Sequence, residues 1–596
     1  MVIVHPPRPR LTLNVGITGH RASILPPNVI EELAPIVDGV FQELRAAAVR
    51  LHSRESAIFD SAPPQLRLHT PLATGADQLA ARSARASQYH VRALLPFAPD
   101  DYRSDFAEGA ERDEFERELA AADRLFALPG QRGNEEGAYV VVGKAVVAAA
   151  DILVAIWDGR EGNGPGGTAH VVNLALANWV PVIHVIVDRD GGAVSGPRLL
   201  VGGDTVEPIV KPLACPDDYE ALLSDTLVPH TSEERGHIQD YFAEVSRRRN
   251  WRIEYPMLLA ALGVKSLPPM PLREAAPSHH PEVTAGIGQP TGQTLDIHCV
   301  AAAYEWANVL AIRYAQLFRS GHVANYVLSA LAVLLALFGL LVPSIKVYLV
   351  IAELGTIGLL FLNTSSGTTG DWHRRWLQYR HLAESLRPLS YLKCSGLIST
   401  PFRSDFVQGA AHREAGADWT RWYAAAIWRE MDSPTGIVSR ADIEALVKEF
   451  TDEQIVPQAQ YHRVNADRMY KLDHRLHEVG NFLTGAVIAV CALFLVGYNL
   501  VHHWVVSLTN SFIFLTAGLP AVGAAVFGLR GHGEHLLAAS RSANTASSLE
   551  ATATRLGKAN DAEGLAHEFE HAASIMLADL NEWTISYRER SLEIPA

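Results

Sequence analysis

The stretch VANYVLSALAVLLALFGLLVPSIKVYLVIAELGTIGLLFL, residues 323–362, decides the fold of the second half of this chain. Residues 323–342 carry no charge, and about 20 such residues are the length that a helix needs to cross a bilayer. Pro343 and Ser344 interrupt the apolar run, and a second run covers 347–363. We therefore expect a hairpin of two transmembrane helices joined by a short turn.

A second pair of apolar runs, 481–501 and 511–529, predicts another hairpin. Arginines and lysines flank the outer ends of both pairs, whereas the two short turns contain a single lysine, Lys346. This bias places both termini on the cytoplasmic side of a multi-pass protein of the inner (cytoplasmic) membrane. A soluble protein with very apolar central helices is the alternative, but the pairing of the runs around short turns argues against it.

The composition limits the classes of function. A chain of 596 residues suggests several domains, and 48% hydrophobic residues fit a soluble part joined to a membrane part. The net charge of −14 argues against nucleic-acid binding as the main function. The four cysteines have no paired spacing, which indicates a reducing, cytosolic setting for the soluble part. The N-terminus shows no long apolar core of a cleaved signal peptide.

Residues 1–230 alternate short apolar runs with helical patterns, which predicts a soluble α/β domain with a parallel sheet. The glycine-rich stretch 191–203 predicts a loop. Polar or glycine-bearing clusters directly follow several expected strands, and the carboxyl ends of parallel strands share one edge of a sheet, where ligands bind. The expected strands are 11–17, 66–72, 91–96, 124–128, 152–157 and 180–187, and the expected helices between them are 27–53, 78–88, 105–122, 139–149 and 169–178.

The candidate ligand-binding residues come from the loops at this edge. Glycines let backbone N–H groups approach a phosphate, a helix N-terminus adds positive potential, and Arg21 can make a forked, charge-assisted contact. A purely structural domain, with tight turns and a surface arginine, is the alternative. The complete set of candidates is Gly16, Thr18, Gly19, His20, Arg21, Thr74, Gly75, Ala76, Asp77, Phe97, Asp158, Gly166, Gly167 and Thr168.

Six motifs follow one another in order: GITGHR, ATGADQLAA, LLPF, IWDG, GPGGTAHVVNLA and VPVIHV. Together, over about residues 10–190, they resemble the SLOG superfamily. The resemblance implies a Rossmann-like fold and a nucleotide-derived ligand, ADP-ribose-like or a cyclic nucleotide, with its phosphate on the loop at Gly166–Thr168. Enzymatic members carry a glutamate on the next helix, where this chain has Val171, which cannot transfer a proton. Binding without turnover is therefore expected, and cleavage of an N-glycosidic bond is the alternative.

The rest of the chain is expected to surround the two membrane pairs. Residues 231–294 predict a helical connector followed by a proline- and glycine-rich linker. The lead-in helix and the helix WLQYRHLAESL after the second crossing resemble the SLATT family of two-crossing membrane modules, over 295–394. Residues 457–596 look like a more divergent copy, and 395–456 are expected to be a cytoplasmic excursion of unknown purpose. The resemblance implies a pore-forming or membrane-disrupting effector of bacterial conflict systems.

Two sets of ionisable residues in the second half of the chain are further candidate sites. Glu353 lies inside the second expected crossing, where such a group usually faces a bundle interior or water, so it is a pore or gating candidate. A protonated glutamate bonded to a neighbouring helix is the alternative. His567 and His571 fit an HExxH pattern that can hold zinc, with Glu568 activating a water. No third ligand stands at a diagnostic spacing, and the solvated face of an amphipathic helix is the alternative.

These patterns predict an α/β Rossmann-like N-terminal domain and an all-α membrane domain with four transmembrane helices and long cytoplasmic helices. The predicted function is a membrane effector of the antiviral defence type, in which the soluble domain senses a nucleotide-derived signal and gates a channel-like bundle. Homo-oligomers in the lipid bilayer are expected, because four crossings per chain rarely enclose a pore. No catalytic residue is assigned. A membrane-tethered nucleotide N-glycosidase and an HExxH metalloprotease are the alternatives.

Overall fold

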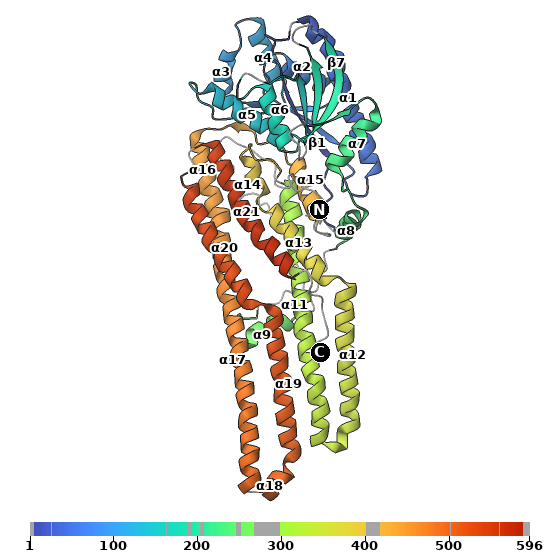
Figure 1. Cartoon of the computed structure of the whole chain (residues 1–596), viewed down its shortest axis with the longest axis vertical. Helices are drawn as coiled ribbons and strands as arrows, with labels where there is room; N and C mark the ends of the chain where they lie inside the picture. The colour runs from blue at the N-terminus through green and yellow to red at the C-terminus, as the bar shows by residue number, and fades with distance from the viewer. Residues whose placement is uncertain are drawn as a thin grey trace.

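The described residues form an α/β domain at one end of an elongated molecule and two helical hairpins at the other end (Figure 1). Residues 246–251 and 268–294 of the expected connector and linker lie outside them. The computed structural model describes residues 5–25, 27–161, 164–188, 193–202, 208–245, 252–267, 298–400, 418–500, 502–558 and 561–587.

A nine-stranded mixed sheet forms the core of the α/β domain, in the order β8-β7-β6-β5-β1-β2-β3-β4-β9. Strands β1 to β6 are parallel and nearly continuous in apolar residues, because helices cover both faces of the sheet. The predicted strands are confirmed to within two residues at each end. The strands are β1 (Thr12–Gly19), β2 (Gln65–Thr70), β3 (His90–Leu95), β4 (Arg124–Ala127), β5 (Ile152–Trp157), β6 (Val182–Val187), β7 (Val194–Val201), β8 (Ile209–Pro212) and β9 (Gly436–Ile437).

The helices of this domain alternate with its strands as expected. Helix α1 buries an apolar stripe that includes Val37, Phe41 and Leu44. The expected helix 105–122 begins later, at α4, because Gly109 precedes it with a φ of 95°. The helices are α1 (Pro27–Arg54), α2 (Ala76–Ala86), α3 (Pro99–Tyr102), α4 (Ala110–Ala120), α5 (Glu135–Ala149), α6 (Thr168–Ala177) and α7 (Pro216–Leu227). The connector that follows contains α8 (Ser232–Phe242) and α9 (Glu254–Ala261), and α9 lies far from the sheet (Figure 1).

Two segments depart from the sequence predictions and extend the sheet at both edges. Strand β7 lies where the glycine-rich stretch predicted a loop, and it pairs antiparallel with β6 while burying Leu199 and Leu200. The loop prediction was wrong for these residues because pairing with a neighbouring strand outweighed the local glycine signal. Strand β9 comes from the segment 395–456, which was expected to be a cytoplasmic excursion of unknown purpose, and pairs in parallel with β4. The sheet is therefore completed by residues far along the chain.

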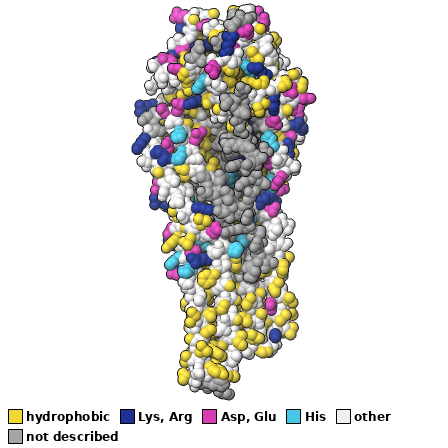
Figure 2. Space-filling view, viewed as in Figure 1, with side chains coloured by type: hydrophobic (Ala, Val, Ile, Leu, Met, Phe, Trp, Pro, Cys, Tyr) yellow, Lys and Arg dark blue, Asp and Glu magenta, His cyan; other side chains and the backbone are white. Residues whose placement is uncertain are grey.

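Four helices of the second half are long and apolar enough to cross a membrane. Their apolar ends form a band with few charged side chains, far from the α/β domain (Figure 2). Both hairpin turns lie at this far end (Figure 1). The helices are α11 (His298–Leu341), α12 (Lys346–Thr369), α13 (Trp372–Leu386), α14 (Leu389–Cys394), α15 (Asp418–Glu430), α16 (Arg440–Phe450), α17 (Val456–Leu500), α18 (His502–Ser507), α19 (Thr509–Gly533), α20 (His535–Leu556) and α21 (Ala562–Tyr587).

The two hairpins share one plan. In each, a helix of 44 or 45 residues runs from the middle of the molecule to the far end, and a shorter helix returns. The returning helix ends at a left-handed residue, Asp371 (φ 48°) in the first unit and Glu534 (φ 40°) in the second. A further helix, α13 or α20, then packs back along the long helix. The two units therefore have the same order of elements.

The four long apolar helices pack as an open row rather than as a closed ring. Extensive contacts along the described residues join α12 to α11, α11 to α19, and α19 to α17. Glycines allow the central contact: a Cβ at Gly518 would lie 3.0 Å from Leu334, and one at Gly528 would collide with Tyr326. Helices α12 and α17 therefore form the two outer edges of the row.

Candidate functional site

The sheet has a topological switch point between β1 and β5, the two strands from which the order of the sheet runs in opposite directions. Thr18 pairs with Ala155 and Gly19 with Ile156 at the carboxyl ends of these strands. In folds of this kind the loops that leave two such strands lead to opposite faces of the sheet, and ligands usually bind in the crevice between them. We call this end of β1 to β5 the carboxyl edge.

The first loop of the carboxyl edge is tied to the β5 loop through His20. The His20 backbone N–H donates to the Ile156 carbonyl at 3.1 Å, and the Asp158 N–H donates to His20 Nε2 at 3.3 Å. Asp158 Oδ1 also lies 3.4 Å from the same nitrogen. Both side chains are almost fully buried, at 5% and 1% exposure, so this pair fixes the loops.

The β2 loop fits against the β1 loop only because of glycines. Gly75 has a φ of 89°, and a Cβ there would lie 2.6 Å from the Ala22 nitrogen. At Gly19, a Cβ would lie 2.4 Å from the Ala76 Cβ. The Ala76 N–H then donates to the His20 carbonyl at 3.1 Å. Residues from three predicted clusters are therefore joined by direct contacts, as the sequence predicted.

Asp77 is a buried carboxyl group in the first turn of α2. Its side chain is 5% exposed, and burial raises the pKa of Asp77 to about 7, although the Ala73 N–H and the charge of Arg21 act to lower it. The carboxyl group therefore changes protonation near neutral pH. Such a group beside a ligand crevice is a candidate proton donor.

Arg21 lies over an aromatic and acidic cluster. Its guanidinium is 5.3 Å from the centre of the Tyr139 ring, and the Tyr139 hydroxyl donates to Asp105. Partial burial opposes the charge of Arg21, but the hydrogen bond with Tyr139 and the nearby Asp105 raise the pKa of Arg21. Arg132 donates to Asp105 Oδ1 at 2.7 Å. An exposed, permanently charged guanidinium is thus held at the crevice, where it can pair with an anion.

The glycine-rich loop leads into the N-terminus of α6. Gly166 has a φ of 81° and lies close to Tyr139, and Gly167 precedes the first helical residue, Thr168. Among the described residues, no side chain caps the first turn of α6. The nearest atom to a Cβ at Gly167 would be the Gly164 carbonyl oxygen, at 3.6 Å. The backbone N–H groups of this turn are therefore open to an anion.

Two candidates, Gly16 and Phe97, and the neighbouring Val171 have structural positions rather than exposed ones. Gly16 lies inside β1, where a Cβ would lie 2.9 Å from the Ala150 Cβ, so this glycine serves the packing of α5 on the sheet. Phe97 is fully buried, and Arg132 covers its ring at 4.2 Å. Val171 is buried against Gly143, so the position of the catalytic glutamate in the resembled enzymes belongs to the core here. Thr18 and Thr74 are half-buried at the edge itself.

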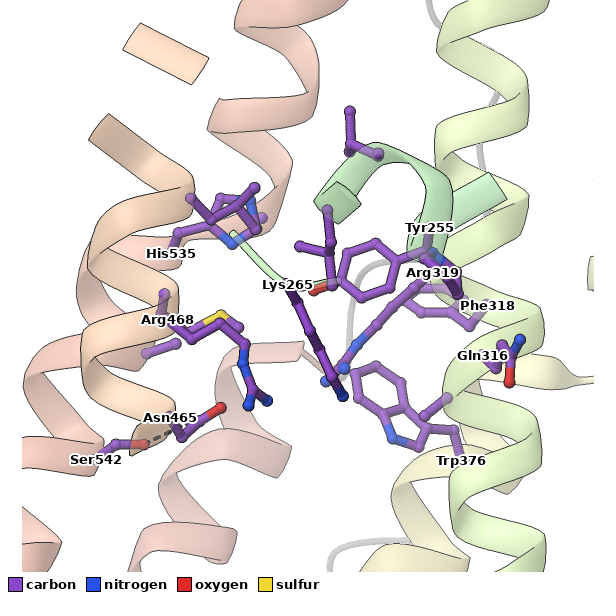
Figure 3. Close-up of a pocket in the computed structure, with 18 of the residues that line it drawn as sticks. Tyr255, Lys265, Gln316, Phe318, Arg319, Trp376, Asn465, Arg468, His535 and Ser542 are labelled. Carbon is purple, nitrogen blue, oxygen red and sulfur yellow. Dashed lines mark hydrogen bonds between the residues drawn. The ribbon is translucent and has the colours of Figure 1, made fainter. Parts of the chain in front are cut away.

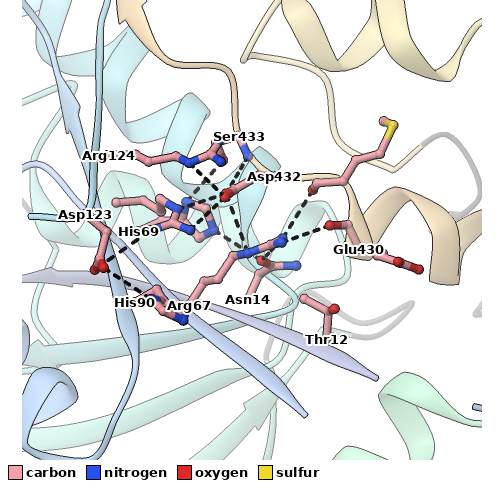
Figure 4. Close-up of polar contacts among 12 residues, drawn as sticks. Thr12, Asn14, Arg67, His69, His90, Asp123, Arg124, Glu430, Asp432 and Ser433 are labelled. Atoms are coloured by element: carbon pink, nitrogen blue, oxygen red, sulfur yellow. Dashed lines mark hydrogen bonds and ion pairs between the residues drawn. The ribbon is translucent and has the colours of Figure 1, made fainter. Parts of the chain in front are cut away.

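The opposite ends of the same strands, the amino edge, carry a buried charge network (Figure 4). Arg92 makes two bonds to Asp432, at 2.9 and 2.7 Å, and Arg67 Nε lies 3.5 Å from the same carboxylate. These arginines, with Arg124, hold the pKa of Asp432 far below its usual range despite burial. Arg67 also donates to the carbonyl groups of residues 429 and 430, both at 2.8 Å. These hydrogen bonds therefore fix the C-terminal end of α15 against the sheet.

A second buried carboxylate joins the connector to the long helices. Glu244 Oε1 accepts hydrogen bonds from Tyr314 of α11 at 2.7 Å, and from Arg375 and Tyr379 of α13 at 2.7 and 3.0 Å. Arg375 forms an ion pair with this carboxylate. The residues after α8 are thus fixed to the first hairpin unit.

The two remaining candidate sets lie far from the carboxyl edge. Glu353 is half-buried on α12, the outer helix of the row. His567 and His571 are exposed on α21, and Glu568 pairs with Arg555 at 3.1 Å while Phe569 packs on Phe450. No group of three metal-ligating side chains lies together among the described residues. The HExxH pattern thus lies on a packing helix.

The sequence reasoning missed the amino-edge network, and one signal could have revealed it. Arg67 and Arg92 stand inside apolar strands, and a charge buried in a strand requires a partner. Nothing in the sequence indicates that this partner is Asp432. Comparisons with family models, curated proteins and solved structures find no match to this chain.

Proposed function

We propose that this protein is a membrane effector whose α/β domain, a SLOG-like sensor, binds a nucleotide-derived anion at the carboxyl edge and thereby changes the state of its membrane helices. The convergence of the β1, β2 and β5 loops at the switch point carries the proposal. Arg21 and the open first turn of α6 supply a positive charge and backbone donors at that crevice. ADP-ribose-like molecules and cyclic nucleotides combine the negative phosphate and the planar base that such a site accepts.

The contacts between the two halves support coupling. The amino-edge network fixes the sheet on α15, and Glu244 fixes the connector on α11 and α13. A ligand can shift the membrane helices only if it binds two conformations with different affinity. Because these links are buried and bonded, a movement of the loops relative to the sheet has a continuous path to the first hairpin unit.

The open row of four helices supports assembly into SLATT-like homo-oligomers. A row with two outer edges cannot enclose a pore within one chain, whereas α12 of one copy against α17 of the next can close a ring. Glu353 lies on the outer helix α12, where it would meet another copy. In this arrangement the four helices cross the membrane, the hairpin turns lie on its far side, and both termini stay in the cytoplasm, as the basic flanks predict.

The proposal is tested with full-length protein in liposomes. ADP-ribose, cyclic ADP-ribose and cyclic oligonucleotides are screened for an increase in the unfolding midpoint, and the positive ligand is tested for ion flux. Gly167→Glu places a carboxylate at the α6 N-terminus without a steric conflict, so it should abolish both responses but keep the unliganded midpoint. Gly196→Glu, in an open position on β7, is the matched control. Flux that persists in Gly167→Glu would remove the carboxyl edge from the mechanism.

A nucleotide N-glycosidase is the second candidate, and the pKa of Asp77 near 7 favours it. The position of the usual glutamate is filled by the buried Val171, so Asp77 would have to act as the acid. Release of free base from nucleoside monophosphates, lost in Asp77→Asn, would establish hydrolysis. Ligand binding without base release would exclude hydrolysis and support the sensor function.

A further inference from the structure

A cavity of about 680 Å³ lies between the two hairpin units, close to the point where the apolar band begins (Figure 3). Its walls come from both units and from the connector: α9, α11 and α13 on one side, and α17, α19 and α20 on the other. Its volume falls in the range of small-molecule sites. It is separate from the carboxyl edge, so its occupant is independent of the proposed sensor ligand.

The lining carries a large excess of positive charge. Among the lining residues that the structure describes, Glu384 is the only carboxylate. It is already engaged by Arg380 at 2.6 Å and by Arg387 at 3.2 Å. The wall also carries other basic side chains and several histidines. The basic side chains are Lys265, Arg319, Arg468 and Arg541, and the histidines are His322, His462, His532 and His535.

Three of these cations are held without an acidic partner. Within the described part of the chain, no carboxylate forms an ion pair with Lys265, Arg319 or Arg468, and all three point into the same space (Figure 3). Arg319 comes from the first unit and Arg468 from the second. Like charges that converge in a partly enclosed space repel one another, so this arrangement favours an anion between them.

The wall also positions these cations. The Arg319 guanidinium lies 5.5 Å from the Tyr255 ring and 5.1 Å from the Trp376 ring, which fixes its stem and leaves N–H groups for a ligand. Asn465 donates to Ser542 at 2.9 Å on the opposite wall. Burial, together with the charges of Arg319 and Arg530, lowers the pKa of His535 to about 4, against the effect of Asp473. His535 is therefore neutral near pH 7, and the positive charge of the wall comes from its lysine and arginines.

We propose that this cavity binds the phosphate group of an organic phosphate, which bridges the two hairpin units through Arg319 and Arg468. Phosphate matches the forked donors of two arginines and the point charge of Lys265. Because the cavity lies next to the apolar band, one source of this phosphate group is the headgroup of an anionic phospholipid. The cytosol allows the other, a soluble phosphate compound. The bridge would set the spacing of the two units.

The lipid arm of the test uses the full-length protein in nanodiscs of phosphatidylcholine, with or without phosphatidylglycerol. Phosphatidylglycerol should raise the unfolding midpoint of the wild type but not that of Arg319→Gln/Arg468→Gln. The control is Arg475→Gln, an exposed arginine on α17 that does not line the cavity, and it should respond like the wild type. An equal loss of response in Arg475→Gln would attribute the lipid effect to surface charge and overturn the lipid source.

The soluble arm keeps the phosphatidylcholine nanodiscs and adds inorganic phosphate or ATP at constant ionic strength, balanced with sodium chloride. A midpoint increase in the wild type and a dissociation constant at least tenfold weaker in the double variant would identify a soluble phosphate. Lys265→Gln, an exposed position, repeats both arms with a variant whose folding is not at risk. The double variant should also unfold at a higher temperature than the wild type without phosphate, because it lacks the repulsion. Identical responses of wild type and both variants in both arms would overturn the site.

Discussion

At the amino ends of β1, β2 and β3, charged side chains are buried and paired with one another, whereas at the carboxyl ends the loops present backbone donors and an exposed arginine. Arg67 and Asp432 are 3% and 6% exposed, and each bonds to groups from distant parts of the chain. Arg21, at the other end of the sheet, is exposed and stacks on Tyr139. At one end of the strands the buried charges thus neutralise one another, and the other end can accept a partner.

In this sheet, the polar groups that stabilise the fold thus lie at one edge, and the polar groups that can bind a ligand lie at the other. The buried carboxylate of Asp432 is paired with Arg67, Arg92 and Arg124, so its charge is neutralised within the protein. A helix N-terminus without a side-chain cap and a cation without a carboxylate keep that capacity. Mutations at the amino edge should therefore change stability, and mutations at the carboxyl edge should change binding. The predictions below test this separation, from the largest expected effect to the smallest.

Asp432→Ala should give the largest loss of stability, about 3–5 kcal/mol, because it leaves Arg67 and Arg92 buried without their counter-charge. Denaturant unfolding of the full-length protein measures it. Asp101→Ala removes an exposed carboxylate of α3 and should change stability by less than about 0.5 kcal/mol. A small effect of Asp432→Ala would mean that the amino edge does not hold the two halves together.

The same carboxylate, Asp432, should make the stability of the protein decrease in acid. The pKa of Asp432 is depressed in the folded protein, so its contribution is complete above the unfolded pKa of about 4 and is lost as the pH falls below it. The stability difference between wild type and Asp432→Asn should therefore shrink below about pH 4. Unfolding curves at a series of pH values measure the difference, and a gap that stays constant into the acid range would contradict the ion pair.

Gly75→Ala should cost about 1–3 kcal/mol, because a Cβ there meets the backbone of the β1 loop and the φ of 89° is strained for alanine. Gly109→Ala is a matched control, since its φ is 95° but nothing lies within 4 Å of the added Cβ. The difference between the two variants isolates the close approach of the loops. Gly75→Ala should also abolish ligand binding, which Gly109→Ala should keep.

Asp77→Asn tests the titration at the carboxyl edge. The pKa of Asp77 is raised to about 7 in the folded protein, so wild-type stability should fall as the pH rises from about 4 to 7, by at most about 1.4 kcal/mol per pH unit. The asparagine variant stays neutral and should match the wild type at pH 4 and exceed it at pH 8. Asp101→Asn provides the exposed control. A variant less stable than the wild type at pH 8 would show that the native carboxylate is charged and paired.

Arg21→Gln should have the smallest effect on stability, about 0.5–1 kcal/mol from the lost stacking on Tyr139. Its effect on ligand affinity should be larger, because the forked charge is the only exposed arginine proposed for the anion. Calorimetric titration with the ligand from the screen measures the affinity. Arg117→Gln, on the exposed face of α4, should change neither quantity. Unchanged affinity in Arg21→Gln would indicate that the α6 N-terminus binds the anion without Arg21.

The local patterns were sufficient for most of the sheet and for the carboxyl edge. Each loop follows a short apolar strand, and parallel strands must end on the same edge, so Gly19, Gly75 and Asp158 could be placed together from order alone. Their detailed roles could not, since the sequence does not say that Gly16 packs on α5 or that Phe97 is covered by Arg132. Packing of one side chain on another depends on elements that are distant in the chain.

The sequence by itself determined the strand-loop-helix alternation, the edge where the loops meet, and four apolar helices in two hairpins. These follow from residue type and period, which act over a few residues. Only the tertiary structure decided that β9 extends the sheet and α15 packs against it, that Asp432 neutralises Arg67 and Arg92, and that Arg319 and Arg468 face one cavity. Those contacts join residues hundreds of positions apart, and a buried charge shows in the sequence that it needs a partner but not which partner it has.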